Sequence, residues 1–410
     1  MRVKMTFAVL AMVTLALSLP ASSTANRSVH VEAGESIQAA IDAAKPGTTI
    51  KVEAGTYAES VIIAKDGIEL VGEGRKKTHI VAPPGPPGDC PGGICVSDPA
   101  DPNHVVRDVD ISHLSVKGFI FGIFYANTEG GEVTRTILSE YEAYGLFAND
   151  SSGIKISRNV TYNSVDEVDP EAGIYIGDSP HADATVSKNV SFGNSFGIFI
   201  RDAAHGKLLE NKTFSNCVGI LFLNTDESQA PPEFQGPSID VKDWPTEDNL
   251  VAGNNRECAA SDEGPPVSGV GIAVLGGNDI DLIDNGVFGN KPATGFESAF
   301  AGGILVTASP EFTPPRLSTD IKVGFNSAFG NATDLVLDPG NEARFFANDC
   351  LTSQPDGLCD DSDLAGHHGD NDDRDDDRDH GDRHHKKHKK DKGSKHGKQK
   401  NKKHYKRDRD

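Results

Sequence analysis

Residues 189–222 read NVSFGNSFGIFIRDAAHGKLLENKTFSNCVGILF and contain two copies of one pattern. In each copy an asparagine, four further residues and a second asparagine precede a glycine and a short apolar run. The pattern returns, with insertions between the copies, at Asn249 with Asn254, Asn285 with Asn290 and Asn326 with Asn331. A repeat of roughly 22 residues indicates one structural unit copied along an axis.

The repeated unit is typical of β-strands rather than of helices. Ile, Val and Phe alternate with polar residues, and the chain contains 43 glycines, which long amphipathic helices do not tolerate. We therefore expect an all-β solenoid of roughly ten coils. In such a coil the repeated asparagine can adopt the left-handed backbone of a tight turn. Its amide can also bond to the asparagine of the next coil, ~4.8 Å away.

The first repeats are preceded by a predicted helix. Residues 36–44 (SIQAAIDAA) place Ile37, Ala40, Ile41 and Ala44 on one face, with Ser36 as a cap before them and Pro46-Gly47 as a stop after them. Short strands are expected at 49–52, 61–63 and 68–71, with a turn at 55–57. An amphipathic helix in this place suits a lid over the open end of a stacked sheet.

Three short segments carry a family resemblance. Residues 36–41 (SIQAAI), 46–50 (PGTTI) and 55–57 (GTY), together with the later repeats, resemble the pectin-lyase-like, right-handed parallel β-helix superfamily. The resemblance covers most of residues 31–350 and implies a single-stranded right-handed parallel β-helix with a short N-terminal capping helix. The superfamily includes pectate lyases, polygalacturonases, pectin methylesterases, alginate epimerases, phage tailspikes and non-catalytic surface proteins. The resemblance is therefore specific for the fold and not for the activity.

The two ends of the chain differ in composition from the repeats. Residues 1–25 are expected to be a signal peptide, because Arg2 and Lys4 precede an apolar run at 7–19 that is too short to span a bilayer. Residues 26–359 are expected to form the β-helix domain, and 360–410 a disordered tail rich in His, Asp and Lys. We therefore expect a secreted, extracellular or cell-surface protein without a membrane span.

Charge narrows the possible partners. The net charge is −21, and the repeat region is acidic throughout, so nucleic-acid binding by the body is not expected. The tail is mostly Asp at 370–382 and mostly Lys, Arg and His at 384–409. Its basic half can contact an anionic cell-wall polymer, and its histidines can bind metal ions loosely.

The chain contains six cysteines, an even number that suits disulfides in an exported protein. Two pairs bracket short loops, Cys90 with Cys95 and Cys350 with Cys359. Cys217 and Cys258 remain, and they can meet if their coils are neighbours. Sequence alone leaves the connectivity open, and no cysteine spacing predicts a zinc site.

Candidate site residues follow the strands of the repeat. Asp150, Asp178 and Asp202 each lie five residues after the glycine of a predicted strand, so stacking in register would place these three acids on neighbouring coils. Arg201 directly precedes Asp202, and Asp226 follows closely behind Asn224, the residue five positions after Gly219; these two complete the predicted catalytic set. Asp178 and Asp202 are also candidate ligands for calcium, which prefers carboxylate oxygens.

Such a cluster suits more than one chemistry. In a lyase or an epimerase, calcium would acidify the proton next to a uronate carboxylate, and Arg201 or Lys207 would remove it. In a hydrolase, one carboxyl would protonate the leaving oxygen while another activates water. His181 and His205 lie in the same neighbourhood but are expected to be loop residues rather than ligands.

A purely structural interpretation competes with these roles. Asp and Asn are ordinary turn residues, so a column of them is expected in any β-solenoid. The Asp-Pro-His signature of alginate epimerases is interrupted here by Ser179, and Asn224-Thr225-Asp226 resembles only part of a polygalacturonase motif. Trp244 and Phe234, in a long insertion, would either stack on sugar rings or anchor their loop.

We expect an exported protein that binds or processes an acidic or neutral polysaccharide as a lyase, hydrolase or epimerase. The predicted site is a groove along the sheet near the five candidate catalytic residues, because long insertions flank the acidic column. The alternative is a non-catalytic surface or adhesion scaffold whose charged tail contacts the cell wall or metal ions.

Overall fold

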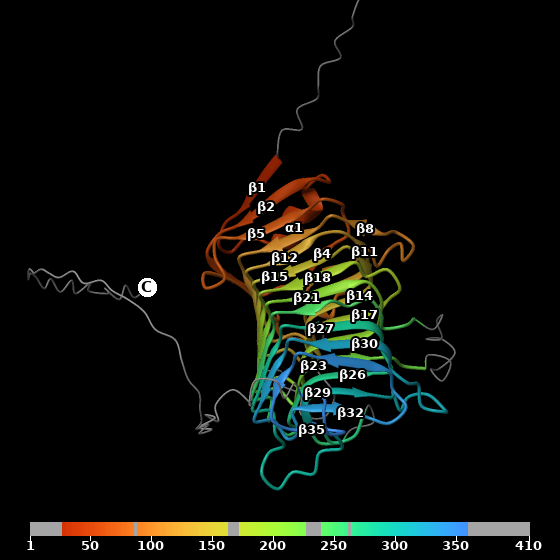
Figure 1. Ribbon diagram of the computed structural model, residues 1–410. Helices are drawn as coiled ribbons and strands as arrows, with labels where there is room; N and C mark the ends of the chain where they lie inside the picture. Colours follow the sequence, from red (N-terminus) through yellow and green to blue (C-terminus); the bar gives the residue numbers. More distant parts are fainter. Residues whose placement is uncertain (1–26, 86–87, 163–171, 227–238, 261–263, 360–410) are drawn as a thin grey trace, which may run out of the picture. The chain divides into compact units, whose positions relative to one another are not determined.

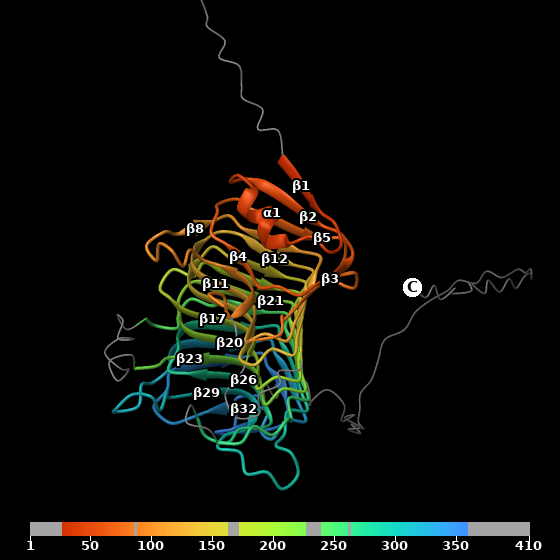
Figure 2. The same cartoon turned by 180° about the vertical axis from the view of Figure 1, so that it is seen from behind.

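Three parallel β-sheets, stacked coil upon coil, form the body of the protein (Figure 1). The computed structural model describes residues 27–85, 88–162, 172–226, 239–260 and 264–359. Each turn of the chain contributes one strand to each sheet in sequence order, and all pairings within the sheets are parallel. Figure 2 shows strands of one sheet following one another along the stack in the order of the chain. This is the right-handed parallel β-helix that the repeat predicts.

The first sheet has 12 strands in the described part of the chain. They are β1 (Arg27–Val31), β2 (Thr48–Val52), β5 (Glu69–Gly72), β9 (Asp110–Ser112), β12 (Glu132–Thr134), β15 (Lys155–Ser157), β18 (Ala184–Ser187), β21 (Gly206–Leu209), β24 (Thr246–Glu247), β27 (Asn278–Ile283), β30 (Thr319–Gly324) and β33 (Ala343–Phe346).

The second sheet has 11 described strands. They are β3 (Gly55–Tyr57), β6 (Thr78–Val81), β10 (Ser115–Lys117), β13 (Ile137–Ser139), β16 (Val160–Tyr162), β19 (Val190–Phe192), β22 (Lys212–Phe214), β25 (Leu250–Ala252), β28 (Gly286–Phe288), β31 (Ser327–Phe329) and β34 (Asp349–Cys350). Residues 55–57, expected as a turn, are therefore a strand, because β3 pairs with β6 to begin this sheet.

The third sheet has 12 described strands, one of which, β8 (Val106–Arg107), pairs only with the end of β11. The others are β4 (Val61–Ile63), β7 (Gly92–Val96), β11 (Phe121–Glu129), β14 (Tyr144–Ser152), β17 (Ala172–Ser179), β20 (Phe196–Ala203), β23 (Val218–Leu223), β26 (Val270–Leu275), β29 (Gly302–Thr307), β32 (Leu335–Leu337) and β35 (Ser353–Gln354). The stack is thus slightly taller than the ten coils expected.

Aliphatic side chains of equal register fill the interior. One column of the third sheet is buried on every coil and consists of Ile94, Ile123, Leu146, Ile174, Ile198, Ile220, Ile272, Ile304 and Leu335. A glycine precedes each of these residues except Leu335, which follows Asp334, and this explains the Gly-Ile repeat. A Cβ at Gly219, for example, would lie 2.7 Å from the carbonyl oxygen of Gly271 on the next coil. The repeat therefore records how closely successive coils approach.

Helix α1 (Ile37–Ala43) covers the N-terminal end of the stack, where it contacts β1 and β2 of the first sheet and β4 of the third, as the sequence predicts. Gln38 bonds both backbone groups of Ile62 in the edge strand β4, accepting from its N–H at 2.6 Å and donating to its carbonyl at 3.2 Å. Glu59 accepts bonds from the N–H groups of Ile37 and Gln38, while Lys65 donates to three carbonyls at the other end of the helix. Side chains thus satisfy the free groups of both helix ends.

Two buried ladders of asparagine side chains connect the coils, as predicted. The first runs through Asn159, Asn189, Asn211, Asn249, Asn285, Asn326 and Asn348, and each amide except the last donates to the next at 2.9–3.1 Å. The expected left-handed backbone lies one residue earlier, for instance at Lys188 and Asp248 (φ 59° and 56°). The preceding residue therefore makes the turn, and this leaves the asparagine free to point inward.

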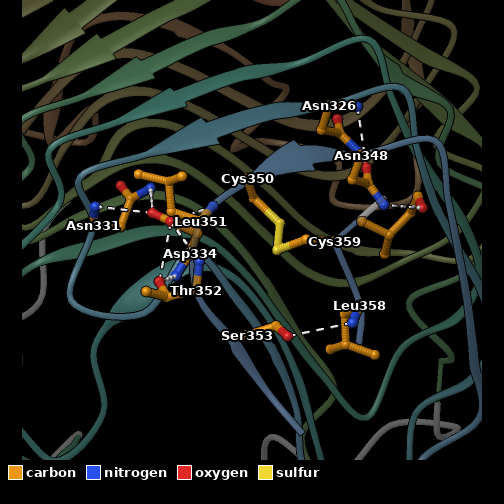
Figure 3. The surroundings of a disulfide bond; sticks show 11 residues. Asn326, Asn331, Asp334, Asn348, Cys350, Leu351, Thr352, Ser353, Leu358 and Cys359 are labelled. Carbon is orange, nitrogen blue, oxygen red and sulfur yellow. Dashed lines mark hydrogen bonds between the residues drawn. A yellow bond between two sulfur atoms is a disulfide. The ribbon is translucent and has the colours of Figure 1, made fainter. Parts of the chain in front are cut away.

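Three disulfides join the six cysteines: Cys90–Cys95, Cys217–Cys258 and Cys350–Cys359. Both local pairs and the remaining pair thus form as the sequence allows. The second ladder runs through Asn216, Asn254, Asn290 and Asn331 and ends at Asp334, which accepts from Asn331. Figure 3 shows that Cys359 is joined to Cys350 of the last second-sheet strand, beside Asp334.

The expected signal peptide, tail and residue Phe234 lie outside the described residues. No helix within the described residues is long and apolar enough to cross a membrane.

Candidate functional site at the third sheet

Three aspartates stack at one register position of the third sheet. Asn149 pairs with Gly177, which pairs with Arg201, and the residues that follow these three are Asp150, Asp178 and Asp202. All three aspartates have left-handed backbones, with φ of 45°, 47° and 46°. The predicted column on neighbouring coils is therefore confirmed, and each aspartate bends its strand one or two residues before the strand ends.

The exposure of the column falls along the stack. Asp150 is exposed, Asp178 is half-buried and Asp202 is fully buried. Asp202 accepts a hydrogen bond from the Thr225 N–H at 2.8 Å and another from the Thr225 hydroxyl, both across to the next coil. Asp202 therefore holds two coils together. Of the two neighbouring acids Asp178 and Asp202, Asp178 is the one that a ligand can reach.

Arg201 lies among the acids of the column. Its Nε is 3.2 Å from Oδ2 of Asp202, while its side chain is 37% exposed. On the neighbouring coil its partner is Gly177, and the space over this glycine is taken by the Tyr175 hydroxyl, which a Cβ there would overlap. Asp202 thus fixes the guanidinium of Arg201 on one side, and part of the Arg201 side chain remains open to solvent.

The electrostatics of this cluster fix its protonation states. Burial lowers the pKa of Arg201, but Tyr175, Asp178 and Asp202 outweigh this and raise it above its ordinary value. Burial raises the pKa of the Tyr175 hydroxyl well above its ordinary value, and Asp178 adds to the effect. Arg201 therefore remains a cation at neutral pH. It suits the binding of a carboxylate rather than the removal of a proton.

Burial also raises the pKa of Asp202, although the bonds from Thr225 and the charge of Arg201 act in the opposite direction.

Nothing in the described residues gathers three or more His, Cys, Asp or Glu side chains that could hold a metal ion. Asp178 and Asp202 are neighbours across one strand spacing, and Arg201 already supplies a positive charge beside them.

The other candidates lie at different places. Asp226 is half-buried on the coil after Asp202. Lys207, the alternative base, belongs to strand β21 of the first sheet. His181 and His205 stack with ring centroids 5.9 Å apart, and His205 pairs with Asp243 at 2.7 Å.

A ladder of aromatic rings precedes the acids on the outer face of the third sheet. Phe124, Phe147 and Tyr175 stack nearly parallel, with centroids 5.2 and 4.8 Å apart, and Phe199 meets Tyr175 edge-on at 5.4 Å. Phe124 and Phe147 are half-buried, whereas Tyr175 is only 2% exposed. The sequence analysis missed this ladder and Tyr175. The available signal was an aromatic residue two positions after the strand glycine in four successive copies, Gly122, Gly145, Gly173 and Gly197.

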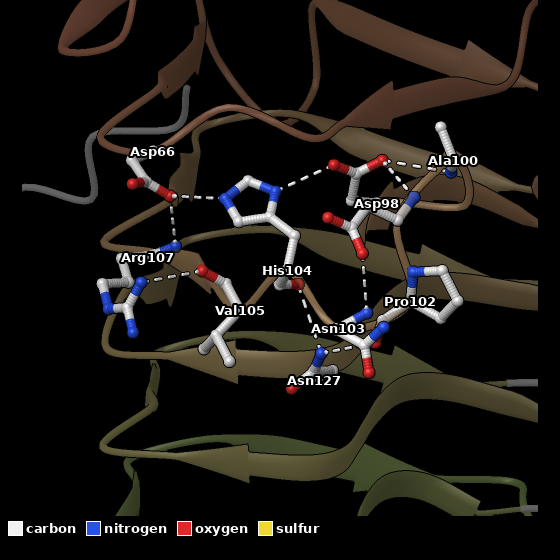
Figure 4. Close-up of polar contacts among 10 residues, drawn as sticks. Asp66, Asp98, Ala100, Pro102, Asn103, His104, Val105, Arg107 and Asn127 are labelled. Carbon is white, nitrogen blue, oxygen red and sulfur yellow. Dashed lines mark hydrogen bonds and ion pairs between the residues drawn. The ribbon is translucent and has the colours of Figure 1, made fainter.

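Several long connections start or end at this sheet. Residues 97–105 and 308–318 follow β7 and β29, and residues 289–301 precede β29. The first of these is fastened at the top of the acid column. His104 pairs with Asp98 at 2.8 Å, while Asn127, which occupies the column position before Asp150, donates to the carbonyls of Pro102 and His104 (Figure 4). Described loops thus border the face that carries the rings and acids.

Trp244 anchors its insertion and does not present a sugar platform. It is fully buried, and its indole Nε1 donates to the carbonyl of Ala203 at 2.9 Å. Of the two roles expected for Trp244, the structure therefore confirms the anchoring one.

Residues 121–313 match the family model described as right handed beta helix region. No curated protein shows significant sequence similarity to the chain. Among solved structures, the A-module of mannuronan C-5 epimerase AlgE4 from Azotobacter vinelandii is similar at 17% identity and a TM-score of 0.54, covering 78% of this chain and 91% of that one.

Two further structures show how widely the fold is used. PfbA, a surface adhesin of Streptococcus pneumoniae, is similar at 13% identity and a TM-score of 0.52 over 77% of this chain and 88% of its own. The DFA-IIIase of Arthrobacter chlorophenolicus A6 is similar at 13% identity and a TM-score of 0.52, and the match covers 75% of this chain and 88% of that one. At these identities the similarity shows the fold alone.

Proposed function

We propose that this chain, a right-handed parallel β-helix protein, is exported and binds and processes a carboxylate-bearing polysaccharide on the outer face of its third sheet. The observation that carries the proposal is the placement of Arg201, a cation whose Nε lies 3.2 Å from Oδ2 of Asp202 while its side chain is 37% exposed. A guanidinium in a fixed position offers paired donors to a carboxylate. The half-buried rings of Phe124 and Phe147 supply apolar surface for the sugar faces nearby.

The residues divide into contact and positioning roles. Arg201 binds the carboxylate of the sugar and stabilises the charge that develops on it. Asp178, half-buried and on the coil beside Arg201, accepts the proton from the carbon next to that carboxylate. Asp202 and Tyr175 are too buried to reach the substrate, so they position Arg201.

Two outcomes follow the loss of that proton. In elimination, the electron pair forms a carbon–carbon double bond, the bond to the glycosidic oxygen breaks, and that oxygen takes a proton from water. In epimerisation, a proton returns to the same carbon from the opposite face. A mannuronan epimerase of this fold performs the second reaction on its own substrate.

The test is a product assay on alginate, polygalacturonate and hyaluronan with the full-length protein. Formation of unsaturated products or a change in uronate stereochemistry supports the proposal, and Asp178→Asn should then reduce the rate by about 10²-fold. Arg158→Gln, which alters an exposed arginine of a turn away from the cluster, serves as the charge control. Silence of the wild type on all three polymers would overturn the catalytic part.

A second candidate is a binding module without turnover. It is favoured by the structural use of Asp202, whose carboxylate is already bonded to Thr225, and the fold also serves a surface adhesin. Binding of a polymer that depends on Arg201, without any product, would select this function.

A further inference from the structure

The second sheet carries its own row of aromatic side chains on its outer face. Register pairing aligns one position of successive strands from β16 to β31, occupied by Tyr162, Phe192, Phe214, Ala252, Phe288 and Phe329. Tyr162, Phe192 and Phe214 stack almost parallel, with centroids 5.0 and 4.9 Å apart. The ring spacing therefore equals the spacing of the strands.

The stack stops at Ala252, where the next ring would stand. Phe214 is 38% exposed, and its only ring neighbour among the described residues is Phe192 on the other side. The following ring, Phe288, leans along its own strand over Gly286, where a Cβ would lie 2.8 Å from it. One face of Phe214 is thus open above a methyl group, with room of about one strand spacing for one further ring.

The surroundings of this gap are apolar on one side and open on the other. Leu250, two residues before Ala252 on the same face, is 40% exposed and forms a wall. At the other side, a Cβ built at Gly253 or Gly289 would meet nothing within 4 Å. A ring can therefore enter from the glycine turns and pack against Phe214 and Leu250.

A single cation stands beside the gap. Lys212 pairs in register with Leu250, is exposed and has no ion-pair partner among the described residues. It precedes Phe214 by two residues, so both side chains lie on the same face about 6.6 Å apart along the strand. The gap thus combines an open aromatic face with a free positive charge, which suits a ring that has an apolar C–H face and bears a carboxylate.

We propose that the gap at Ala252 is an accessory binding site for an acidic pyranose of a polysaccharide. The sugar ring stacks on Phe214 above Ala252, and its carboxylate pairs with Lys212. The site lies on the second sheet and none of its residues belongs to the Arg201 cluster. The gap and the Arg201 cluster have in common only the class of ligand, a carboxylate-bearing polysaccharide, and in this respect the inference rests on the proposed function.

The test fills the gap. Ala252→Phe continues the ring stack and should raise or preserve the melting temperature, because it adds a stacked pair. Binding is measured by calorimetry with hexamers of galacturonate and of mannuronate in an Arg201→Gln background, which separates this site from the third sheet. Ala252→Phe should weaken binding at least tenfold. Lys212→Gln should weaken it about 2- to 5-fold, and Lys155→Gln, an exposed lysine of the first sheet, should leave it unchanged.

Three results would overturn the proposal. Ala252→Phe that binds both hexamers as the parent does would show that the gap holds no sugar. Cellohexaose, a neutral hexamer, binding as tightly as the acidic hexamers would remove the role of Lys212. A dimer in solution that Ala252→Phe abolishes would show that a second copy of the chain occupies the face. Loss of turnover in Arg201→Gln without loss of hexamer binding at the gap would leave this proposal standing.

Discussion

Replacing Asn249 by alanine should remove a link in the middle of the first asparagine ladder. Its Nδ2 donates to the Leu208 carbonyl and to Oδ1 of Asn285, both at 2.9 Å. Its Oδ1 accepts from the backbone N–H and from Nδ2 of Asn211, at 2.9 and 3.0 Å. All three asparagines are at most 1% exposed, so water cannot replace the lost partner.

The magnitude follows from the groups left without a partner. With alanine at position 249, two buried donors of Asn211, its backbone N–H and one N–H of its Nδ2, lose their acceptor. The buried carbonyl of Leu208 also loses the hydrogen bond that Asn249 donates to it. An unsatisfied buried group costs about 1–3 kcal/mol, so the free energy of unfolding should fall by about 4 kcal/mol. Asn103→Ala, at an exposed loop position, should change it by less than about 0.5 kcal/mol.

The assay is guanidinium unfolding followed by two signals. The single tryptophan, Trp244, is fully buried near this coil and reports its unfolding by fluorescence, while circular dichroism reports all the strands. Agreement of the two midpoints tests whether the coils unfold together, as coupled neighbours in a repeat protein should. If the guanidinium midpoint of Asn249→Ala is no lower than that of Asn103→Ala, the ladder does not contribute the stability assigned to it.

Other predictions concern the cap, the carboxyl group of Asp110 and calcium. Glu59→Ala should destabilise the protein by about 1–2 kcal/mol in the same unfolding assay, because two N–H groups of α1 lose their acceptor. Burial and two neighbouring glutamates raise the pKa of Asp110, so Asp110→Asn should stabilise the protein by about 0.5 kcal/mol at pH 7. That gain should vanish below about pH 3.9, where the wild-type carboxyl is neutral in both states; a gain that persists there would contradict it. If calcium binds between Asp178 and Asp202, millimolar calcium should raise the melting temperature of the wild type but not of Asp178→Asn; equal shifts would exclude this site.

The architecture could be predicted from the sequence because the repeat records contacts between coils. In the pair Gly219-Ile220, the glycine is required because the next coil lies too close for a Cβ, and the isoleucine is required to fill the interior column. The recurrence of such pairs therefore predicts both the close stacking of the coils and the buried column. Counting five residues from the strand glycine placed Asp150, Asp178 and Asp202 on one column for the same reason. The loose spacing between later copies did not matter, because insertions lie outside the strands.

The site was less predictable because exposure depends on neighbours rather than on register. Asp178 and Asp202 occupy equivalent positions, yet only Asp202 meets Thr225 on the next coil and is buried. Tyr175 gains its place beside Arg201 because position 177 is glycine, a coincidence across two coils that no single repeat reveals. Sequence reasoning therefore found the column and named Arg201 or Lys207 as the base, but the surroundings of Arg201 keep it protonated.

The most direct test of the proposed function is binding of an oligouronate to the third sheet, measured by calorimetry with the wild type, Arg201→Gln and Arg158→Gln. Pairing of a carboxylate with Arg201 predicts that Arg201→Gln weakens the tighter binding phase by about 10- to 100-fold while Arg158→Gln leaves it unchanged. Equal affinities for all three proteins, or no binding by the wild type, would contradict the assignment of Arg201 as the carboxylate-binding residue.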